Sequence, residues 1–414
     1  MKNKIILILS LVLIFCFVFV SCGKKSDDNS QEDQGDQGNT EGHTHTEMVL
    51  PAVDADCKNT GLTEGKKCTT CGEILVKQTV TPLKHDYSKN GYICAEPDCG
   101  YIKISDGLKY EYNEATNTYT VVGIGTCKEA FVVIPKTYND LPVTAIANGA
   151  FENCNSMRNI ALLENIQTIG KRAFYGCSLL ENVIMSENVT AIGSYAFSDC
   201  VSLKSVMLSN NVHRIEDYTF YKCYKLDNLA ISTRATYVGE RAFGFCKSLT
   251  SMKLPDTVAT LGANAFEFCI SLENIEIGTG ITKIDKETFY GCVGLKDVTI
   301  PDSVVSIGDW AFEFCVSLEN VKIGAGVTSI GNNSFILSRS LASIVIPKKV
   351  AKIGEEAFYD CDQLTIYCEA ESQPSEWNPN WNTTSCPVYW YSEEKPTSDG
   401  NYWHYVDGTA TIWE

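Results

Sequence analysis

Cysteine is the residue type in this sequence best suited to chemistry. The chain has 19 cysteines among 414 residues, and most of them fall into two patterns. One set returns every 23 residues, with a single missing step at Ser338; its members are Cys154, Cys177, Cys200, Cys223, Cys246, Cys269, Cys292, Cys315 and Cys361. The other set forms two Cys-Gly knuckles near the N-terminus, Cys68-x-x-Cys71-Gly and Cys94-x4-Cys99-Gly. Cysteine can ligate a metal, form a disulfide or pack as a small apolar side chain, and each role predicts a different protein.

The periodic set is best explained by packing. A metal needs three or four donors that converge on one point, whereas one cysteine per repeat places the sulfurs in a line. Nine cysteines cannot all pair, and in-register side chains point the same way rather than toward one another. Cysteine is among the most often buried residue types, and Ser338 replaces it at similar volume. We therefore predict a structural column in the core.

The two knuckles resemble a zinc ribbon, in which thiolates on two tight turns close a tetrahedral site. The resemblance implies a structural zinc ion held by Cys68, Cys71, Cys94 and Cys99, with no cofactor for activity. In an exported chain, disulfides and free thiols remain alternatives. Cys57 is then a spare ligand or a disulfide partner. A second disulfide, between Cys368 and Cys386, would close a Pro- and Trp-rich loop.

The periodic cysteines belong to a repeat that positions them. The motif Phe-x-x-Cys aligns ten copies between Phe151 and Phe358, and no copy gains or loses a residue. A clean copy, residues 307–330, reads IGDWAFEFCVSLENVKIGAGVTSI. Val321 and Ile323 alternate as in a half-buried strand, and Pro or Gly follows. Self-similarity at this length predicts a mainly β solenoid, in which each coil is covered only by its neighbours.

The repeat closely resembles the BspA-like (treponemal-type) leucine-rich repeat family over residues 141–366. The resemblance implies a right-handed coil of ten 23-residue repeats. The copies depart from the pattern at Glu216 and Asp285 in place of Gly, at Thr219, Thr288 and Ser334 in place of Ala, and at Ser338. The sequence predicts hairpin-like caps at residues 105–140 and 367–414, because a solenoid must cover its terminal apolar faces. A small Cys-rich module at residues 45–104 precedes them.

Two rows of side chains should face outward from the strands. The fifth position after each cysteine carries mostly short polar residues, and the seventh varies from copy to copy. Such a pair of rows resembles the recognition surface of leucine-rich repeats, although the short polar row could equally form a stabilising ladder. The expected ligand-binding face comprises Asn159, Asn182, Ile184, Ser205, Met207, Asn228, Ser251, Lys253, Asn274, Glu276, Asp297, Asn320 and Lys322.

The N-terminus predicts export. Two lysines precede an apolar run from Ile5 to Val20, and the stretch FVSC ends at Cys22. This resembles the lipobox of bacterial lipoproteins, which implies removal of residues 1–21 and lipidation of Cys22; an ordinary signal peptide or an uncleaved anchor is the alternative. Residues 22–44 are polar and acidic, and they predict a disordered tether.

Charge and motifs exclude several classes of function. The formal net charge of −17 argues against nucleic-acid binding, which needs a basic surface. Nucleophile elbows, zinc-protease helices and phosphate-binding loops are missing, so we expect no enzyme. The chain should be a monomer that meets the membrane only through its lipid anchor. The family resemblance implies an adhesin-like surface protein that binds host matrix or cell-surface proteins. The rivals are a non-adhesive envelope scaffold or spacer and a glycan binder that uses the Trp-rich C-terminal cap.

Overall fold

The computed structural model describes residues 46–57, 60–69, 74–81, 83–86, 94, 99, 101–227, 229–397 and 400–413. These residues fall into two compact units. The first comprises the described residues up to Asp54 together with Gly61–Thr81, and the second comprises Ala55–Thr60 and Pro82–Glu414. Strands, turns and bends make up the described structure, which contains no helix. Within these ranges, therefore, no helix is long and apolar enough to cross a membrane.

The first unit is a small antiparallel assembly. Its three-stranded sheet has the order β1-β3-β4, and β2 pairs with β5. The strands are β1 (Glu47–Leu50), β2 (Gly61–Leu62), β3 (Gly65–Cys68), β4 (Ile74–Val76) and β5 (Val80–Thr81). Most of their side chains are half-buried or exposed, with Cys68 among the few that are buried.

The second unit begins with the hairpin expected before the repeats. Its antiparallel strands β6 and β7 are joined by a turn with Asn117 at a φ of 55°. β7 and β8 then pair in parallel with the first repeat strands, β10 and β11, so coil stacking starts before residue 141. The strands are β6 (Lys109–Asn113), β7 (Thr118–Gly123), β8 (Phe131–Ile134), β9 (Thr137–Tyr138) and β10 (Leu141–Ile146).

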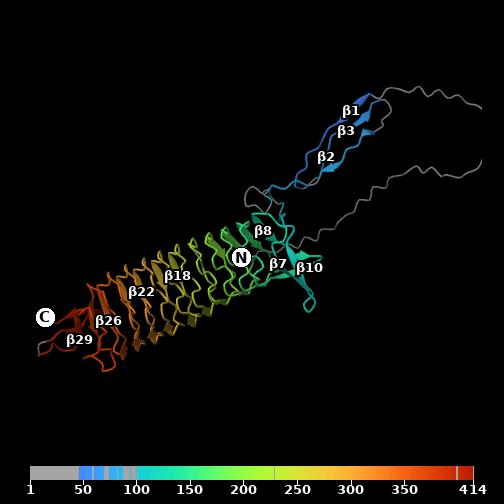
Figure 1. Cartoon of the computed structure of the whole chain (residues 1–414). Coiled ribbons are helices and arrows are strands. Elements are labelled where there is room, and N and C mark those ends of the chain that lie inside the picture. Colours follow the sequence, from blue (N-terminus) through green and yellow to red (C-terminus); the bar gives the residue numbers. More distant parts are fainter. Residues whose placement is uncertain are drawn as a thin grey trace, which may run out of the picture. The chain divides into compact units, whose positions relative to one another are not determined.

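Parallel strands from successive coils form what we call the strand face. They stack in register along the second unit, as Figure 1 shows from β8 to β29. Two sheets contribute, β15-β13-β11-β8 and β18-β20-β22-β24-β26-β28-β29-β30-β31. The new strands are β11 (Asn159–Leu162), β13 (Asn182–Met185), β15 (Ser205–Met207), β18 (Ser251–Lys253), β20 (Asn274–Glu276), β22 (Asp297–Thr299), β24 (Asn320–Lys322), β26 (Ser343–Ile346), β28 (Thr365–Cys368), β29 (Val388–Tyr391), β30 (Tyr402–Val406) and β31 (Thr409–Ile412).

A second row of two-residue strands runs along another side of each coil. In each, the second residue is an aliphatic side chain that points into the core. They pair in parallel from coil to coil in three groups, β12 with β14, then β16-β17-β19, then β21-β23-β25-β27. Their bounds are β12 (Thr168–Ile169), β14 (Ala191–Ile192), β16 (Arg214–Ile215), β17 (Tyr237–Val238), β19 (Thr260–Leu261), β21 (Lys283–Ile284), β23 (Ser306–Ile307), β25 (Ser329–Ile330) and β27 (Lys352–Ile353).

The remaining side of each coil, the turn side, carries the Phe-x-x-Cys motif. All ten phenylalanines from Phe151 to Phe358 are at most 1% exposed. Their rings stack on one another with centroids 5.1–5.7 Å apart and nearly parallel planes. Aromatic pairs at this separation add to the stabilisation from apolar burial. The mainly β solenoid predicted from the sequence is confirmed, with the Phe stack as its central column.

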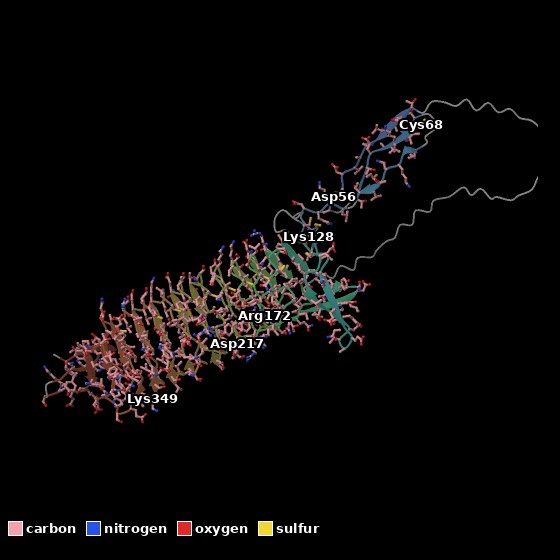
Figure 2. All side chains as sticks on the ribbon, viewed as in Figure 1. Asp56, Cys68, Lys128, Arg172, Asp217 and Lys349 are labelled. Carbon is pink, nitrogen blue, oxygen red and sulfur yellow. The ribbon has the colours of Figure 1, made fainter. Side chains whose placement is uncertain are left out.

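The stack of coils continues past the last repeat into the C-terminal cap. β28 pairs in parallel with β29, and β29 with β30, so the coils outnumber the ten predicted copies. The hairpin of β30 and β31 then closes the sheet, with Asp407 and Gly408 in its turn at positive φ. Along the whole unit, side chains such as those of Arg172 and Lys349 project from the coils into solvent (Figure 2).

Candidate functional site: the strand face and the cysteine cluster

The strand face alternates between buried and exposed side chains, as the sequence predicted. In β15, β18, β20, β22 and β24 the middle residue is buried while both flanking residues are exposed. The buried residue packs against the Phe stack, and each flanking residue lies beside its equivalents in neighbouring coils. The face therefore presents two continuous outward rows.

The fifth-position row forms a hydrogen-bonded ladder in part. The amide of Asn182 donates to Asn159 Oδ1 at 2.7 Å, and the hydroxyl of Ser205 donates to Asn182 Oδ1 at 2.9 Å. Farther along, Asn320 donates to Asp297 Oδ1 at 2.7 Å. These bonds join coils 23 residues apart, so this row has a stabilising role. Asn228, also expected in this row, lies outside the described residues.

The seventh-position row offers side chains with fewer bonds inside the protein. Met207 is 67% exposed. The Lys253 ammonium forms a 2.6 Å ion pair with Glu276, and their side chains remain 76% and 69% exposed. An ion pair so open to water contributes little to stability. This row is free to contact a partner without loss to the fold.

The beginning of that row is covered. Ala161 is only 1% exposed and Ile184 is half-buried. The outward position one coil earlier, Val133, pairs with Ala161 in the parallel register and is only 2% exposed. The backbone N–H of Ser105 donates to Val133 O and the N–H of Val133 donates to Ser105 Oγ, which places Ser105 along the edge of β8. The exposed row effectively begins at Met207.

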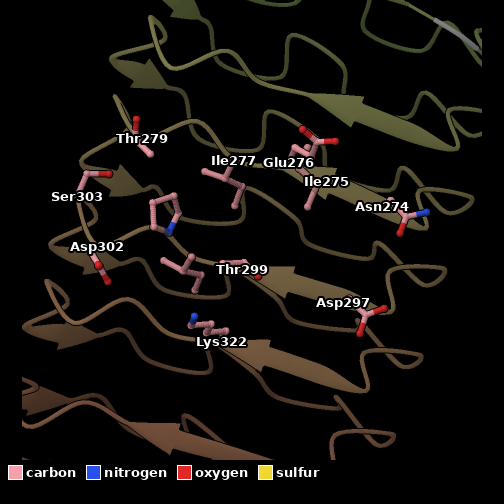
Figure 3. A pocket seen from close by; sticks show the side chains of 12 residues that line it. Asn274, Ile275, Glu276, Ile277, Thr279, Asp297, Thr299, Asp302, Ser303 and Lys322 are labelled. Atoms are coloured by element: carbon pink, nitrogen blue, oxygen red, sulfur yellow. The ribbon is translucent and has the colours of Figure 1, made fainter. Parts of the chain in front are cut away.

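The exposed part of the face contains an open hollow of about 810 Å³. Figure 3 shows Glu276, Thr299 and Lys322 at the ends of their strands, with Thr279, Asp302 and Ser303 in the turns that follow. Carboxylates, an ammonium and hydroxyls thus surround the buried aliphatic side chains of Ile275 and Ile277. The sequence pattern did not indicate Thr279, Asp302 or Ser303, because they follow the strands in irregular turns.

The aromatic residues of the C-terminal cap are mainly core. Trp403 is fully buried, and its indole N–H donates to Cys368 O at 2.9 Å. Trp377 and Trp381 are 3% and 4% exposed, and Trp390 packs partly buried against the same cluster. Burial of this kind is what a cap requires. A sugar-stacking platform would need open indole faces.

The periodic cysteines are core residues with a specific hydrogen bond. From Cys177 to Cys361, each thiol donates to the carbonyl oxygen of the phenylalanine 26 residues earlier, at 3.0–3.3 Å. Ser338 makes the same bond to Phe312 O at 3.3 Å. Burial raises the pKa of the thiols from Cys200 to Cys361, to about 12 for Cys361. These thiols are therefore protonated and unreactive at neutral pH, as expected of core residues.

The zinc set expected from the sequence stays a prediction. Cys68 belongs to the first compact unit, whereas Cys94 and Cys99 belong to the second. Cys71 and the predicted lipidation site Cys22 lie outside the described residues. Instead, the sulfurs of Cys57, Cys94 and Cys99 lie within 4.8 Å of one another. Desolvation, together with the two neighbouring thiols, raises the pKa of Cys57 to about 11. The sequence indicates Cys57 only as a spare ligand or a disulfide partner.

Cys368 and Cys386 also differ from expectation. Both are free, buried thiols, and the predicted bond between them is not formed. The Cys386 thiol donates instead to Cys361 O at 3.5 Å, and the hydroxyl of Thr384 makes the bond that continues the column, to Phe358 O at 3.5 Å. The physical reason is the same coil geometry, since the cap adds a further turn to the stack.

Comparison with known proteins agrees with this architecture. The sequence matches the BspA type leucine rich repeat region over residues 144–272 and 236–365, which together span more than half of the chain. The chain belongs to the BspA-type leucine-rich repeat family. No curated protein matches it.

Several solved structures are similar to this chain. A leucine-rich repeat protein from Bacteroides ovatus is 24% identical, with a TM-score of 0.54 over 70% of this chain and 71% of its own. A leucine rich cell surface protein from Faecalibacterium prausnitzii is 25% identical, with a TM-score of 0.39 over 71% and 96%. The pneumococcal vaccine antigen PcpA is 18% identical, with a TM-score of 0.44 over 71% and 94%. The first of these shows the solenoid fold.

Proposed function

We propose that this chain is an exported, lipid-anchored surface protein that binds a macromolecule along its strand face and so acts as an adhesin. The observation that carries the proposal is the seventh-position row, whose side chains from Met207 to Lys322 stay open to solvent and vary from coil to coil. Membership of a leucine-rich repeat family supports a binding role rather than an enzymatic one. The apolar leader and Cys22 support surface attachment.

The binding surface should centre on the coils that carry Met207, Lys253 and Lys322. From β15 to β24 successive strands span about 20–25 Å at 4.8 Å per coil, and the side chains at the edges extend this further. A surface of this size can supply much of the roughly 800 Å² per partner that standard complexes bury. Its mixture of an exposed methionine, carboxylates and ammonium groups suits a protein partner such as a host matrix protein.

Equilibrium binding of the purified full chain to a panel of matrix proteins tests the proposal. The test variant combines Met207→Ser, Lys253→Ala and Lys322→Ala. Its matched control, also with one apolar and two lysine replacements, combines Val305→Ser, Lys283→Ala and Lys352→Ala beside the second strand row, where all three residues are exposed. We expect saturable binding of one ligand by the parent and the control, and a loss of at least tenfold in the test variant.

The rival functions predict other results. A scaffold or spacer protein would bind no panel member, or would bind equally well after both sets of substitutions. A glycan binder that uses the C-terminal cap would recognise envelope glycans and lose this affinity on replacement of the partly exposed Trp390. Either result would overturn the assignment of binding to the strand face.

A further inference from the structure

We propose that Cys57, Cys94 and Cys99, with His85 as the fourth ligand, form a Cys₃His site for a structural zinc ion. The inference is independent of the proposed function. Three sulfurs that approach within 4.8 Å of one another are close to the separation of about 3.8 Å between thiolates around tetrahedral zinc. The Nδ1 atom of His85 lies 3.3 Å from Cys99 Sγ.

The chain builds this cluster from three separate segments, each held by a backbone or ring contact. The backbone N–H of Lys84 donates to Asp56 O at 3.0 Å, which fixes the residues next in sequence, His85 and Cys57. The N–H of Cys94 donates to Tyr101 O at 2.9 Å, which holds Cys94 beside Tyr101. These contacts are the kind that orient metal ligands before the ion binds.

The imidazole is held as well. The ring of His85 stacks on Tyr101 with centroids 4.0 Å apart and planes 5° apart. Tyr101 is also the residue that accepts the Cys94 bond, so one residue positions a thiol and the histidine together. Cys94 is 6% exposed, while Cys57, Cys99 and His85 are half-buried, which leaves an entry path for an ion.

The number and type of donors favour zinc over a disulfide. A disulfide joins two sulfurs about 2.05 Å apart. One such bond among the three cysteines would leave the third thiol and the imidazole of His85 outside it. Three thiolates and one imidazole form a closed donor set typical of structural zinc, and soft thiolates select against magnesium and calcium. All four residues belong to the second compact unit. The ion would therefore tie the start of that unit to the segment that leads into the solenoid.

The test is zinc content and cobalt substitution of the full chain, purified in mild detergent without chelator. We expect one zinc per chain, removed by a strong chelator and restored by added zinc. Cys57→Ser, Cys94→Ser and Cys99→Ser should each abolish stoichiometric binding. Cys68→Ser and Cys246→Ser are matched controls from the first unit and the core column, and both should retain the ion.

Cobalt reports the ligands directly, since its thiolate charge-transfer absorbance grows with the number of bound sulfurs. We expect three thiolates in the parent and an altered ligand-field spectrum with weaker binding in His85→Ala. An unchanged spectrum in that variant would remove His85 from the site. Loss of zinc in Cys68→Ser, or a disulfide among Cys57, Cys94 and Cys99 in zinc-free protein as isolated, would overturn the proposal. If a serine variant fails to fold, removal of zinc from the unmutated chain by the chelator and its return on addition of zinc still test the proposal.

Discussion

The core column and the strand face are built from the same 23-residue repeat, yet they obey opposite rules. Along the column, every coil supplies a phenylalanine, and all but one supply a cysteine in an equivalent setting. Along the seventh-position row, a methionine is followed by lysine, glutamate and threonine residues in later coils. Repetition marks the positions that must fit a neighbouring coil, and variation marks the positions that face only solvent or a partner. Function is therefore best sought where the repeat is least regular.

The largest effect should come from breaking the Phe stack. Phe243→Ala removes a fully buried ring that stacks on Phe220 and Phe266 at 5.7 and 5.3 Å. Replacement of a buried aromatic by alanine costs about 3–5 kcal/mol, since both the ring contacts and the packing are lost. Denaturant unfolding followed by circular dichroism should show this loss. An exposed aromatic on the turn side, changed by Phe314→Ala, is the control and should cost much less.

A smaller loss is expected where coils approach most closely. A Cβ at Gly262 would meet the backbone of Gly239 and Glu240 at 2.5 Å, so Gly262→Ala must push two coils apart. Overpacking of this kind costs about 1–3 kcal/mol. Gly408→Ala is a less crowded comparison, because nothing lies within 4 Å of its Cβ position, although its positive φ adds some strain. Thermal unfolding of both variants would measure the difference. An unaffected melting temperature in Gly262→Ala would mean that neighbouring coils can move apart at little cost in stability.

The cysteine column predicts a loss of stability at alkaline pH. Burial raises the pKa of Cys361 and Cys368 to about 12 from an ordinary value of 9.0. The contribution to stability is complete below the unfolded-state pKa. It declines as pH rises toward the folded-state value, because the unfolded chain then loses protons that the folded chain retains. The denaturant midpoint should fall between neutral pH and about pH 10, a value above the ordinary thiol pKa. Cys361→Ser should show a smaller fall, and an equal fall would exclude this thiol as a source.

The smallest effect on stability should come from exchanging thiol and hydroxyl within the column. Ser338 already makes the hydrogen bond that each cysteine makes, so Cys246→Ser should cost less than about 1.5 kcal/mol. The reverse change, Ser338→Cys, should leave the unfolding midpoint equal or slightly higher, since a thiol buries more apolar surface. A large loss in either variant would show that the column tolerates only the residue it has at each position.

Much of the solenoid follows from the sequence, because its constraints repeat. One copy predicts the inward phenylalanine, the inward cysteine and the alternation of the strand. The structure confirms the buried phenylalanine in all ten copies, the buried cysteine in nine, and the alternation in β15, β18, β20, β22 and β24. The covered start of the strand face could not be predicted, since nothing in the repeat distinguishes the equivalent positions of Ala161 and Met207, which are 1% and 67% exposed. The grouping of Cys57 with Cys94 and Cys99 was missed for a similar reason. A cluster from non-repeating segments has no period, and sequence spacing suggested the nearer knuckles instead.

The most direct test of the central claim is to locate a bound ligand on the solenoid without mutation. Hydroxyl-radical footprinting of the full chain, free and in complex with the matrix protein that it binds, reports solvent access side chain by side chain. Met207 is on the strand face at 67% exposure, and Trp310 is on the turn side at 38%. If the strand face binds, oxidation of Met207 should fall severalfold in the complex while that of Trp310 stays constant. Protection of Trp310 with Met207 unchanged would contradict the account and move the binding surface to the turn side.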